Sequence, residues 1–178
     1  MEPIKKLVDE HQIILRGIDI LEKSITFLND GEIIPPENFR KLIDFIRNYA
    51  DKYHHAKEED ILFIKMQDSG FPVKGGPIEV MLAEHDQGRN YVKEIEAGVD
   101  LLEQGDYNGN EKIIENSAGY AALLRSHIHK EDNVLYPMAV NALGQDVINS
   151  MIPDFEKVEE AQSGIEQKYI ELLDSLES

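Results

Sequence analysis

The stretch 53-YHHAKEEDILF-63 contains two adjacent histidines, each followed four residues later by a glutamate. A spacing of four places two side chains on one face of a helix, about one turn apart. The stretch therefore offers two His/Glu pairs, His54 with Glu58 and His55 with Glu59. Such a pair occurs both on solvated helices and in metal sites, so the phase of the surrounding apolar residues has to separate the two pairs.

Helical phase distinguishes the first pair from the second. The residues that share the face of His54 are apolar: Ile43, Ile46, Ala50, Ile61 and Leu62. The residues that precede His55 by the same offsets are polar: Asn48, Asp51 and Lys52. We therefore expect His54 and Glu58 to face the core, and His55 and Glu59 to lie towards the polar edge of the helix.

The same apolar spacing of about 3.6 residues runs along nearly the whole chain, and no segment alternates like a strand. It predicts helices over 4–29, 36–66, 78–102 and 111–142, with a kink or break near Pro137, and a last helix over 146–176 that Pro153 can interrupt. The loops between them are rich in Gly, Pro and Asn. This pattern is typical of an all-α protein, an up-down-up-down four-helix bundle. We expect a single domain over 1–178, with the bundle over about 1–143 and an extra C-terminal helix over about 144–178.

Composition narrows the possible functions. The 178 residues carry a net charge of -17 and are 42% hydrophobic, which fits a globular chain that does not bind nucleic acid or an anionic membrane. Cysteine is absent, so disulfides, iron–sulfur clusters and thiolate zinc sites are excluded. The chain contains neither the apolar run of a signal peptide nor a run of 18 apolar residues. We therefore expect a soluble, cytoplasmic protein; the sequence leaves its oligomeric state open.

The histidines give the strongest functional signal. Four of the six lie on apolar faces, one on each predicted bundle helix: His11, His54, His85 and His127. His55 and His129 have polar neighbours instead. One buried histidine is more often a hydrogen-bonded core residue than a ligand. Four that converge need acceptors or a cation, because a buried polar group without a partner costs about 1–3 kcal/mol.

A second His/Glu pair strengthens the case for a metal site. His127 precedes Glu131 by four residues, and the context of His54-x-x-x-Glu58-Glu-x-x-Leu-Phe is repeated as His127-x-x-x-Glu131-Asp-x-x-Leu-Tyr. Imidazole and carboxylate without thiolate suit iron, manganese, zinc or copper. If both glutamates bridge, the four histidines and two glutamates provide eight bonds. That set could hold two irons with a solvent-derived bridging oxygen and open positions, although counting does not identify the metal.

At four motifs, 9-DEH-11, 54-HHAKEEDILF-63, 84-EHDQGR-89 and 127-HIHKEDNVLYP-137, the sequence resembles the hemerythrin-like (HHE cation-binding) family. The resemblance covers roughly residues 1–143. It implies a hemerythrin-like bundle with a non-haem di-iron centre, an oxo- or hydroxo-bridged pair of irons for which zinc or manganese can substitute. The implied ligands are His11, His54, Glu58, His85, His127 and Glu131, with both glutamates as bridges.

The sequence departs from the family at one position. The oxygen-carrying hemerythrins use two histidines four residues apart on the third helix, but here Met81 and Arg89 flank His85 at that spacing. His55 or Glu59, on the second helix, can take the place of the missing histidine. This departure argues against simple reversible oxygen carriage, because the open position is shaped differently.

The expected function is the binding of a small diatomic ligand, oxygen or nitric oxide, in sensing, storage or scavenging. One alternative is a di-iron enzyme acting on peroxide, nitric oxide or ferrous iron, for which the motifs show no obvious proton donor beyond nearby Lys57, Glu59 and Lys130. Another is an iron-storage or iron-responsive protein. A metal-free acidic bundle and haem ligation by two facing histidines also fit part of the pattern.

Overall fold

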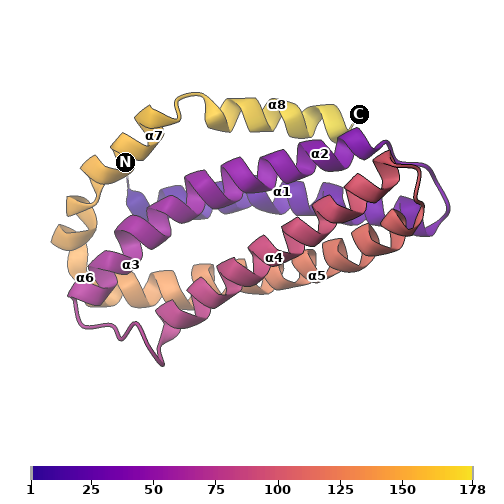
Figure 1. Cartoon of the computed structure of the whole chain (residues 1–178). Helices are drawn as coiled ribbons and strands as arrows, with labels where there is room; N and C mark the ends of the chain where they lie inside the picture. Colours follow the sequence, from indigo (N-terminus) through magenta and orange to yellow (C-terminus); the bar gives the residue numbers. More distant parts are fainter. Residues whose placement is uncertain (1, 178) are drawn as a thin grey trace.

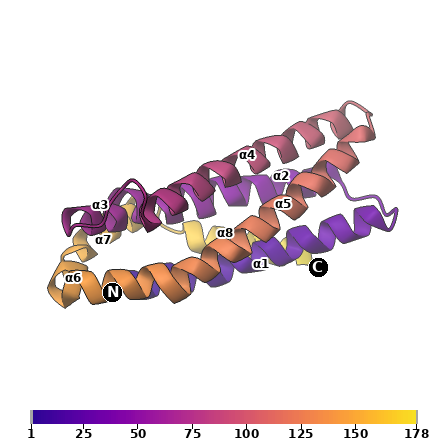
Figure 2. The same cartoon turned by 90° about the horizontal axis from the view of Figure 1, so that it is seen from below.

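The computed structural model describes residues 2–177, and every regular element in that range is helical. Four helical segments form an elongated antiparallel bundle (Figures 1 and 2), which confirms the predicted up-down-up-down architecture. The first and third segments are α1 (Pro3–Asn29) and α4 (Pro77–Glu103). The second runs through α2 (Pro36–Phe45), η1 (Ile46–His55), η2 (Glu58–Leu62) and α3 (Phe63–Asp68). The fourth runs through α5 (Asn108–Lys130), η3 (Glu131–Leu135) and α6 (Tyr136–Ser150).

Three of these segments begin with a proline: Pro3, Pro36 and Pro77. Proline suits the first helical position because its fixed φ matches the helix and its missing N–H has no intrahelical partner there. The segments η1, η2 and η3 are π-helical, and all three lie at the motifs that contain the His/Glu pairs. π-helical turns are rare and are found mostly at functional sites.

The apolar core is divided into two clusters along the bundle. One contains Ile14, Phe45, Tyr49 and Val92, and the other contains Ile4, Leu62, Met66 and Phe155, among further residues. Between them lies a buried polar layer that holds the histidines of the motifs. The two apolar clusters shield this layer from both ends of the bundle.

Helices α4 and α5 approach each other closely at a pair of glycines. A Cβ atom built on Gly109 would lie 2.3 Å from the carbonyl oxygen of Gly98. No side chain fits at that distance, so glycine is required at this crossing. The close contact fixes the spacing of the two helices that supply His85 and His127.

The C-terminal part differs in detail from the prediction. The chain stays helical through Pro137, so no break occurs there. The break lies at Gly144, in the predicted gap between the fourth and last helices, and its φ of 73° is one that only glycine adopts readily. Pro137 is tolerated because it lies in the first turn of α6, directly after a π-helical turn. The predicted last helix is interrupted just before Pro153 and again at 162–164, giving α7 (Ile152–Ala161) and α8 (Ile165–Glu177).

Helix α8 packs along the outside of the bundle against α1 and α2 (Figure 1). Tyr169 is fully buried, its ring lies 5.6 Å from that of Phe45, and its hydroxyl donates to Asp44 Oδ2 at 2.9 Å. At the far end of α8, the Arg16 guanidinium binds Glu177 and Asp174. The extension is therefore anchored by one aromatic contact and a cluster of ion pairs.

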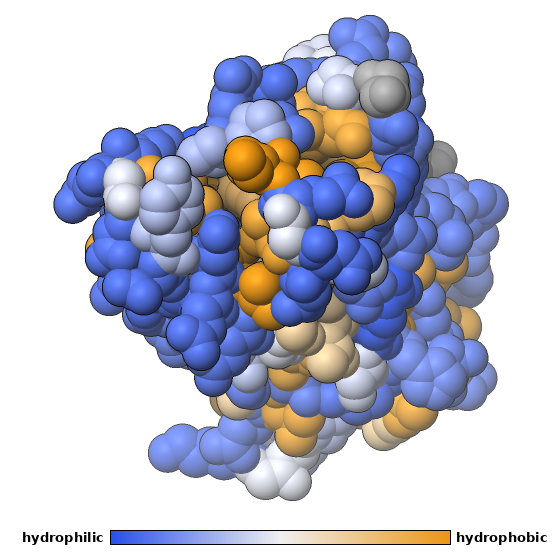
Figure 3. Space-filling model, turned by 90° about the vertical axis from the view of Figure 1, so that its right-hand side faces the viewer, coloured by the Kyte–Doolittle hydropathy of each residue, from blue (hydrophilic) through white to orange (hydrophobic). Residues whose placement is uncertain are grey.

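The surface is mostly polar. Figure 3 shows the end of the bundle that carries the loops 30–35 and 104–107, with apolar side chains gathered in the middle of a hydrophilic face. None of the helices in 2–177 combines the length and the apolar character that a membrane crossing requires.

Candidate metal centre

Each bundle segment directs one histidine into the polar layer. His11 lies on α1, His54 on η1, His85 on α4 and His127 on α5, and none is more than 3% exposed. The helical phase predicts that all four are buried, and the structure agrees. His129, in contrast, is exposed and accepts from the side chain of Asn133.

His55 also lies in this layer, which corrects the expectation that it faces the polar edge. It is only 9% exposed, and its ring stacks on that of His85 with 3.6 Å between centroids. The cause is the π-helical geometry of η1, in which hydrogen bonds span five residues instead of four. The wider turn lets the adjacent residues His54 and His55 both reach the interior.

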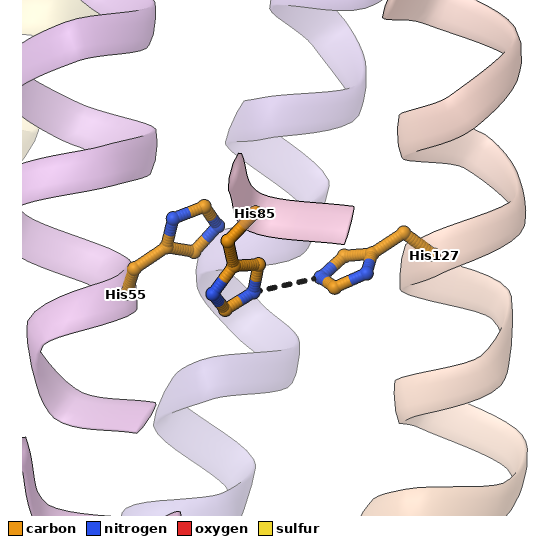
Figure 4. A group of neighbouring side chains, drawn as sticks. All are labelled: His55, His85 and His127. Atoms are coloured by element: carbon orange, nitrogen blue, oxygen red, sulfur yellow. Dashed lines mark hydrogen bonds between the residues drawn. The ribbon is translucent and has the colours of Figure 1, made fainter. Parts of the chain in front are cut away.

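The potential ligand atoms form two neighbouring groups, and within each group they lie within 4.8 Å of one another. The first group consists of His11, His54, Glu58 and Glu131, and the second consists of His55, His85 and His127. Figure 4 shows the second group, with the three imidazoles from η1, α4 and α5 pointing towards one another. Glu59 belongs to neither group.

The two buried glutamates lie between the groups. Glu131 Oε2 is 3.3 Å from His11 Nε2, and its Oε1 is 3.1 Å from His127 Nε2. Glu58 Oε2 is 3.5 Å from His54 Nε2 and 3.7 Å from His85 Nε2. Each carboxylate is therefore placed to bridge two ions, one held by each group.

A second set of carboxylates orients the imidazoles from behind, through Nδ1. The pairs are His11 with Asp132 at 2.8 Å, His54 with Glu10 at 2.8 Å, His55 with Asp51 at 3.2 Å, His85 with Glu59 at 2.6 Å and His127 with Glu84 at 2.8 Å. An ionised carboxylate can only accept a hydrogen bond, so Nδ1 carries the proton in each pair. The Nε2 atom is then left to face the interior, the arrangement that is typical of histidines bound to a metal ion.

The inward-facing atoms lack protein donors. His11 Nε2 and His54 Nε2 are 3.0 Å apart, and His85 Nε2 and His127 Nε2 are 3.1 Å apart (Figure 4). Within residues 2–177, Glu58 Oε2 and both carboxylate oxygens of Glu131 are buried without a hydrogen-bond partner. Lone pairs and carboxylate oxygens that converge in this way are stabilised by a cation, so the donor set fits metal ions.

The pKa values of these groups show the same demand for positive charge. Burial lowers the pKa of His11, but the carboxylates of Asp132 and Glu131 outweigh it and raise that pKa to about 9. Burial would raise the pKa of Glu131, yet His127 and His11 hold it well below its usual range. Burial and the neighbouring Glu131 raise the pKa of Glu58 well above its usual range. Without a metal ion, protons must therefore supply the positive charge.

Two other histidines of the layer, His54 and His55, are favoured in the neutral form. Burial and the neighbouring His11 lower the pKa of His54 well below its usual value. Burial and the neighbouring His85 lower the pKa of His55 to about 4. A metal ion binds the neutral form of imidazole, so both rings are ready for coordination near neutral pH.

Two lysines contact carboxylates that orient the imidazoles. The buried ammonium of Lys57 contacts the Glu10 carboxylate and lies 3.4 Å from the ring centroid of Tyr53, and Lys130 contacts Glu84 in the same way. Both of the carboxylates that these lysines hold are hydrogen-bonded to a histidine of the layer. The sequence placed these lysines near the motifs, but it did not identify the glutamates that link them to the histidines.

Tyr136 is a further residue of the layer that the sequence motifs did not single out. Its buried hydroxyl donates to Glu58 Oε1 at 2.6 Å and lies 3.4 Å from His11 Nε2. The signal was present in the repeated motif, where Leu62-Phe63 is matched by Leu135-Tyr136, so that only the second copy has a hydroxyl at this position.

A cavity of about 310 Å³ opens beside the second group. Its inner end is formed by His55, His85 and His127. A much smaller void beside His11, His54 and Glu131 shares Ala50 and Leu124 with this cavity. The layer can therefore be approached from solvent between η1, α4 and α5.

The comparisons with known proteins agree with this geometry. The model of the hemerythrin HHE cation-binding domain matches residues 2–139. An uncharacterised protein of Mycobacterium tuberculosis is 23% identical over 159 residues, which cover 89% of this chain and 61% of the relative. The iron-sulfur cluster repair protein YtfE of Pectobacterium atrosepticum is 29% identical over 77% of this chain and 62% of its own length. YtfE of Yersinia pestis is 37% identical over 49% of this chain and 40% of its own length.

The chain thus spans about three-fifths of the length of the first of these relatives, 61% in the mycobacterial case. No solved structure matches. The family model, in contrast, includes the first three bundle segments, the fourth as far as residue 139, and every residue of the two ligand groups. On that match, this chain belongs to the hemerythrin HHE cation-binding domain family.

Proposed function

We propose that this chain is a non-haem di-iron protein that binds a small diatomic ligand, oxygen or nitric oxide. The observation that carries the proposal is the pair of imidazole groups with Glu58 and Glu131 between them. His11 and His54 would hold one iron, His55, His85 and His127 the other, and both glutamates would bridge. When bound, the irons supply reversible redox chemistry and open coordination positions.

The two groups differ in a way that favours ligand binding at one of them. The first group has two imidazoles and the second has three, so one ion has fewer protein donors than the other. Tyr136 stands beside the group with two imidazoles, and its phenol is a hydrogen-bond donor. We infer that the diatomic ligand binds on the His11/His54 side, where Tyr136 can donate to it, and that it enters through the cavity.

Glu59 is one of the carboxylates that contact an imidazole from behind, and this position gives it a different role from that of a metal ligand. Its Oε1 accepts from His85 Nδ1 at 2.6 Å and from the Arg89 guanidinium at 2.8 Å. The hydrogen bond from His85 lowers the pKa of Glu59 to about 2, so the carboxylate stays ionised and holds the ring in place. We therefore propose His55 as the replacement for the missing third-helix histidine, and Glu59 as the residue that orients His85.

The direct test is metal analysis with an absorption spectrum on protein purified without added metal. We expect about two irons per chain, as in other di-iron bundles, and the near-ultraviolet absorption of bridged ferric iron. A Soret band would indicate haem, and fully folded protein that contains no iron as purified would refute the proposal.

A matched pair of substitutions tests the site itself. His127→Ala removes a buried imidazole of the second group, whereas His129→Ala removes an exposed one two residues away. We expect the first to lower the iron content strongly and the second to leave it unchanged. Equal iron contents in the two variants would contradict the assignment.

A second candidate is an iron-handling role in cluster repair, which the name of the YtfE relatives favours. This role would require the chain to release iron to an acceptor. Incubation of the iron-loaded protein with an apo iron–sulfur protein distinguishes the two, because a diatomic-binding protein would keep its iron while it binds nitric oxide. Steady-state consumption of nitric oxide or peroxide would instead favour an enzyme.

A further inference from the structure

The cavity beside the second imidazole group is much larger than a diatomic ligand requires. We propose that it binds a medium-chain carboxylate or a similar amphipathic organic anion, with the tail inside the cavity and the head at Lys52. This inference goes beyond the proposed diatomic ligand, and it does not depend on metal binding because the walls and the rim are made of protein groups alone.

Size is the first argument. The cavity measures about 310 Å³, whereas a water-sized molecule needs only about 15 Å³ of such space. Pockets for small organic molecules usually measure about 300–1,000 Å³. The cavity therefore lies within the range of organic ligands and far above the range that a diffusing diatomic molecule needs.

The chemistry of the walls is the second argument. Beyond the imidazoles, the inner wall is largely apolar: Ile46, Ala50, Val92, Leu123 and Leu124, with the ring of Tyr120. Gly88 adds width because it has no side chain, and a Cβ there would meet only Tyr120, at 3.5 Å. Such a wall stabilises an alkyl chain through burial from water and offers few groups to a polar ligand.

The charges at the rim are the third argument. Both acids at the rim already form ion pairs, Asp51 with Arg89 and Glu84 with Lys130. Arg47, also at the rim, forms a two-pronged ion pair with Glu96. Lys52 makes no ion pair with any residue in 2–177, and its ammonium donates only to Asn48 Oδ1, at 3.3 Å.

Lys52 is therefore a spare cation at the mouth of an apolar cavity, in a protein whose net charge is -17. A ligand with an alkyl chain and one negative charge complements both features. A neutral apolar ligand would leave the ammonium unused, and a cation would be repelled by it.

The test is calorimetric titration of the purified full chain with octanoate, hexanoate and octan-1-ol. Each buried methylene should strengthen binding about fourfold, so octanoate, with two more methylenes, should bind roughly 15-fold more tightly than hexanoate. Lys52→Ala should weaken octanoate binding about threefold and leave octanol binding unchanged, because only the carboxylate uses the ammonium. Lys52→Arg should retain octanoate affinity, and Lys74→Ala, at an exposed loop position, should have no effect.

A substitution that fills the cavity provides an independent test. Gly88→Leu introduces a side chain on α4 at a position where no backbone atom obstructs it, and it should abolish octanoate binding while the iron content stays unchanged. If octanoate binds Gly88→Leu as well as the unmodified chain, the association is non-specific and the inference is wrong. Absence of binding to the unmodified chain would also overturn it.

Metal analysis of the same samples separates this inference from the proposed function. Octanoate binding to protein that retains no iron would support the cavity ligand and refute the di-iron proposal. Iron-loaded protein that binds no octanoate would do the reverse.

Discussion

The hydroxyl of Tyr136 donates a 2.6 Å hydrogen bond to Glu58 Oε1, whereas the residue that matches Tyr136 in the first half of the chain, Phe63, has no hydroxyl to offer Glu131. The two copies of the motif also differ at the position of His55, which is matched by Ile128 in the second copy. These two differences between the copies of the motif make the two ligand groups unequal.

The first prediction concerns this hydroxyl. Tyr136→Phe leaves Glu58 Oε1 buried without its donor, and we expect the protein to lose about 1–3 kcal/mol of stability, seen as a lower melting temperature. The iron content should stay unchanged, while dissociation of bound nitric oxide, followed by stopped-flow absorption, should become faster. The control is Tyr107→Phe, because Tyr107 is 80% exposed. Identical nitric oxide kinetics in both variants would argue against a role for Tyr136 in ligand binding.

His55 provides the second prediction. If it completes the second group, His55→Ala should lower the iron content from about two to about one per chain, because a single group loses one of its imidazoles. Helical content should be retained, since the ring stacks on His85 without carrying core packing of its own. Metal analysis with circular dichroism checks this. An unchanged iron content would indicate that His55 has a purely structural role.

The outer carboxylates provide the third prediction. Glu84→Gln keeps an acceptor for His127 Nδ1 but removes the charge, and we expect metal affinity to fall about 10–100-fold. Competition with a chelator measures the change. Glu115→Gln, at an exposed position on α5, is the matched control and should bind metal normally. If both variants lose metal equally, the effect comes from surface charge instead of ring orientation.

The fourth prediction concerns pH. The pKa of His11 is raised from 6.5 to about 9, so its stabilising contribution to the metal-free protein is fully present below pH 6.5 and is lost as the pH rises through 9. The pKa values of His127 and Glu58 are also raised, and they act in the same direction. We therefore expect the melting temperature of metal-stripped protein to fall between pH 6.5 and 9.

Metal binding should show the opposite trend over the same range, because the ligands must lose these protons before they bind an ion. Affinity should rise with pH, and addition of ferrous iron at pH 7 in weak buffer should release protons that an indicator dye detects. A melting temperature of the metal-stripped protein that rises towards pH 9 would contradict the direction of these shifts.

Much of the fold and part of the site could be predicted from periodicity. His11, His85 and His127 lie on α-helices whose apolar neighbours recur every three or four residues, so their phase indicates burial correctly. The helix boundaries follow for the same reason, with prolines at the starts of the segments.

His55 could not be placed in this way, because the rule assumes α-helical phase and η1 is π-helical. The rule that proline breaks a helix fails at Pro137 for a similar reason. This proline lies in the first turn of α6, where it leaves the helix intact. The outer partners were beyond reach for a different reason. Apart from Asp51, which lies four residues before His55, these partners are distant in sequence from their histidines, and one sequence carries no direct record of such pairs.

The outer contacts from His11 to Asp132 and from His85 to Glu59 each join two different segments of the bundle. The separations are 121 and 26 residues, so the first ring is oriented only when the fourth segment has docked. While the chain is being synthesised, a ribosome-bound product that ends before residue 131 contains neither Glu131 nor Asp132. If the two groups hold ions, the first group therefore stays incomplete until the fourth segment has been synthesised.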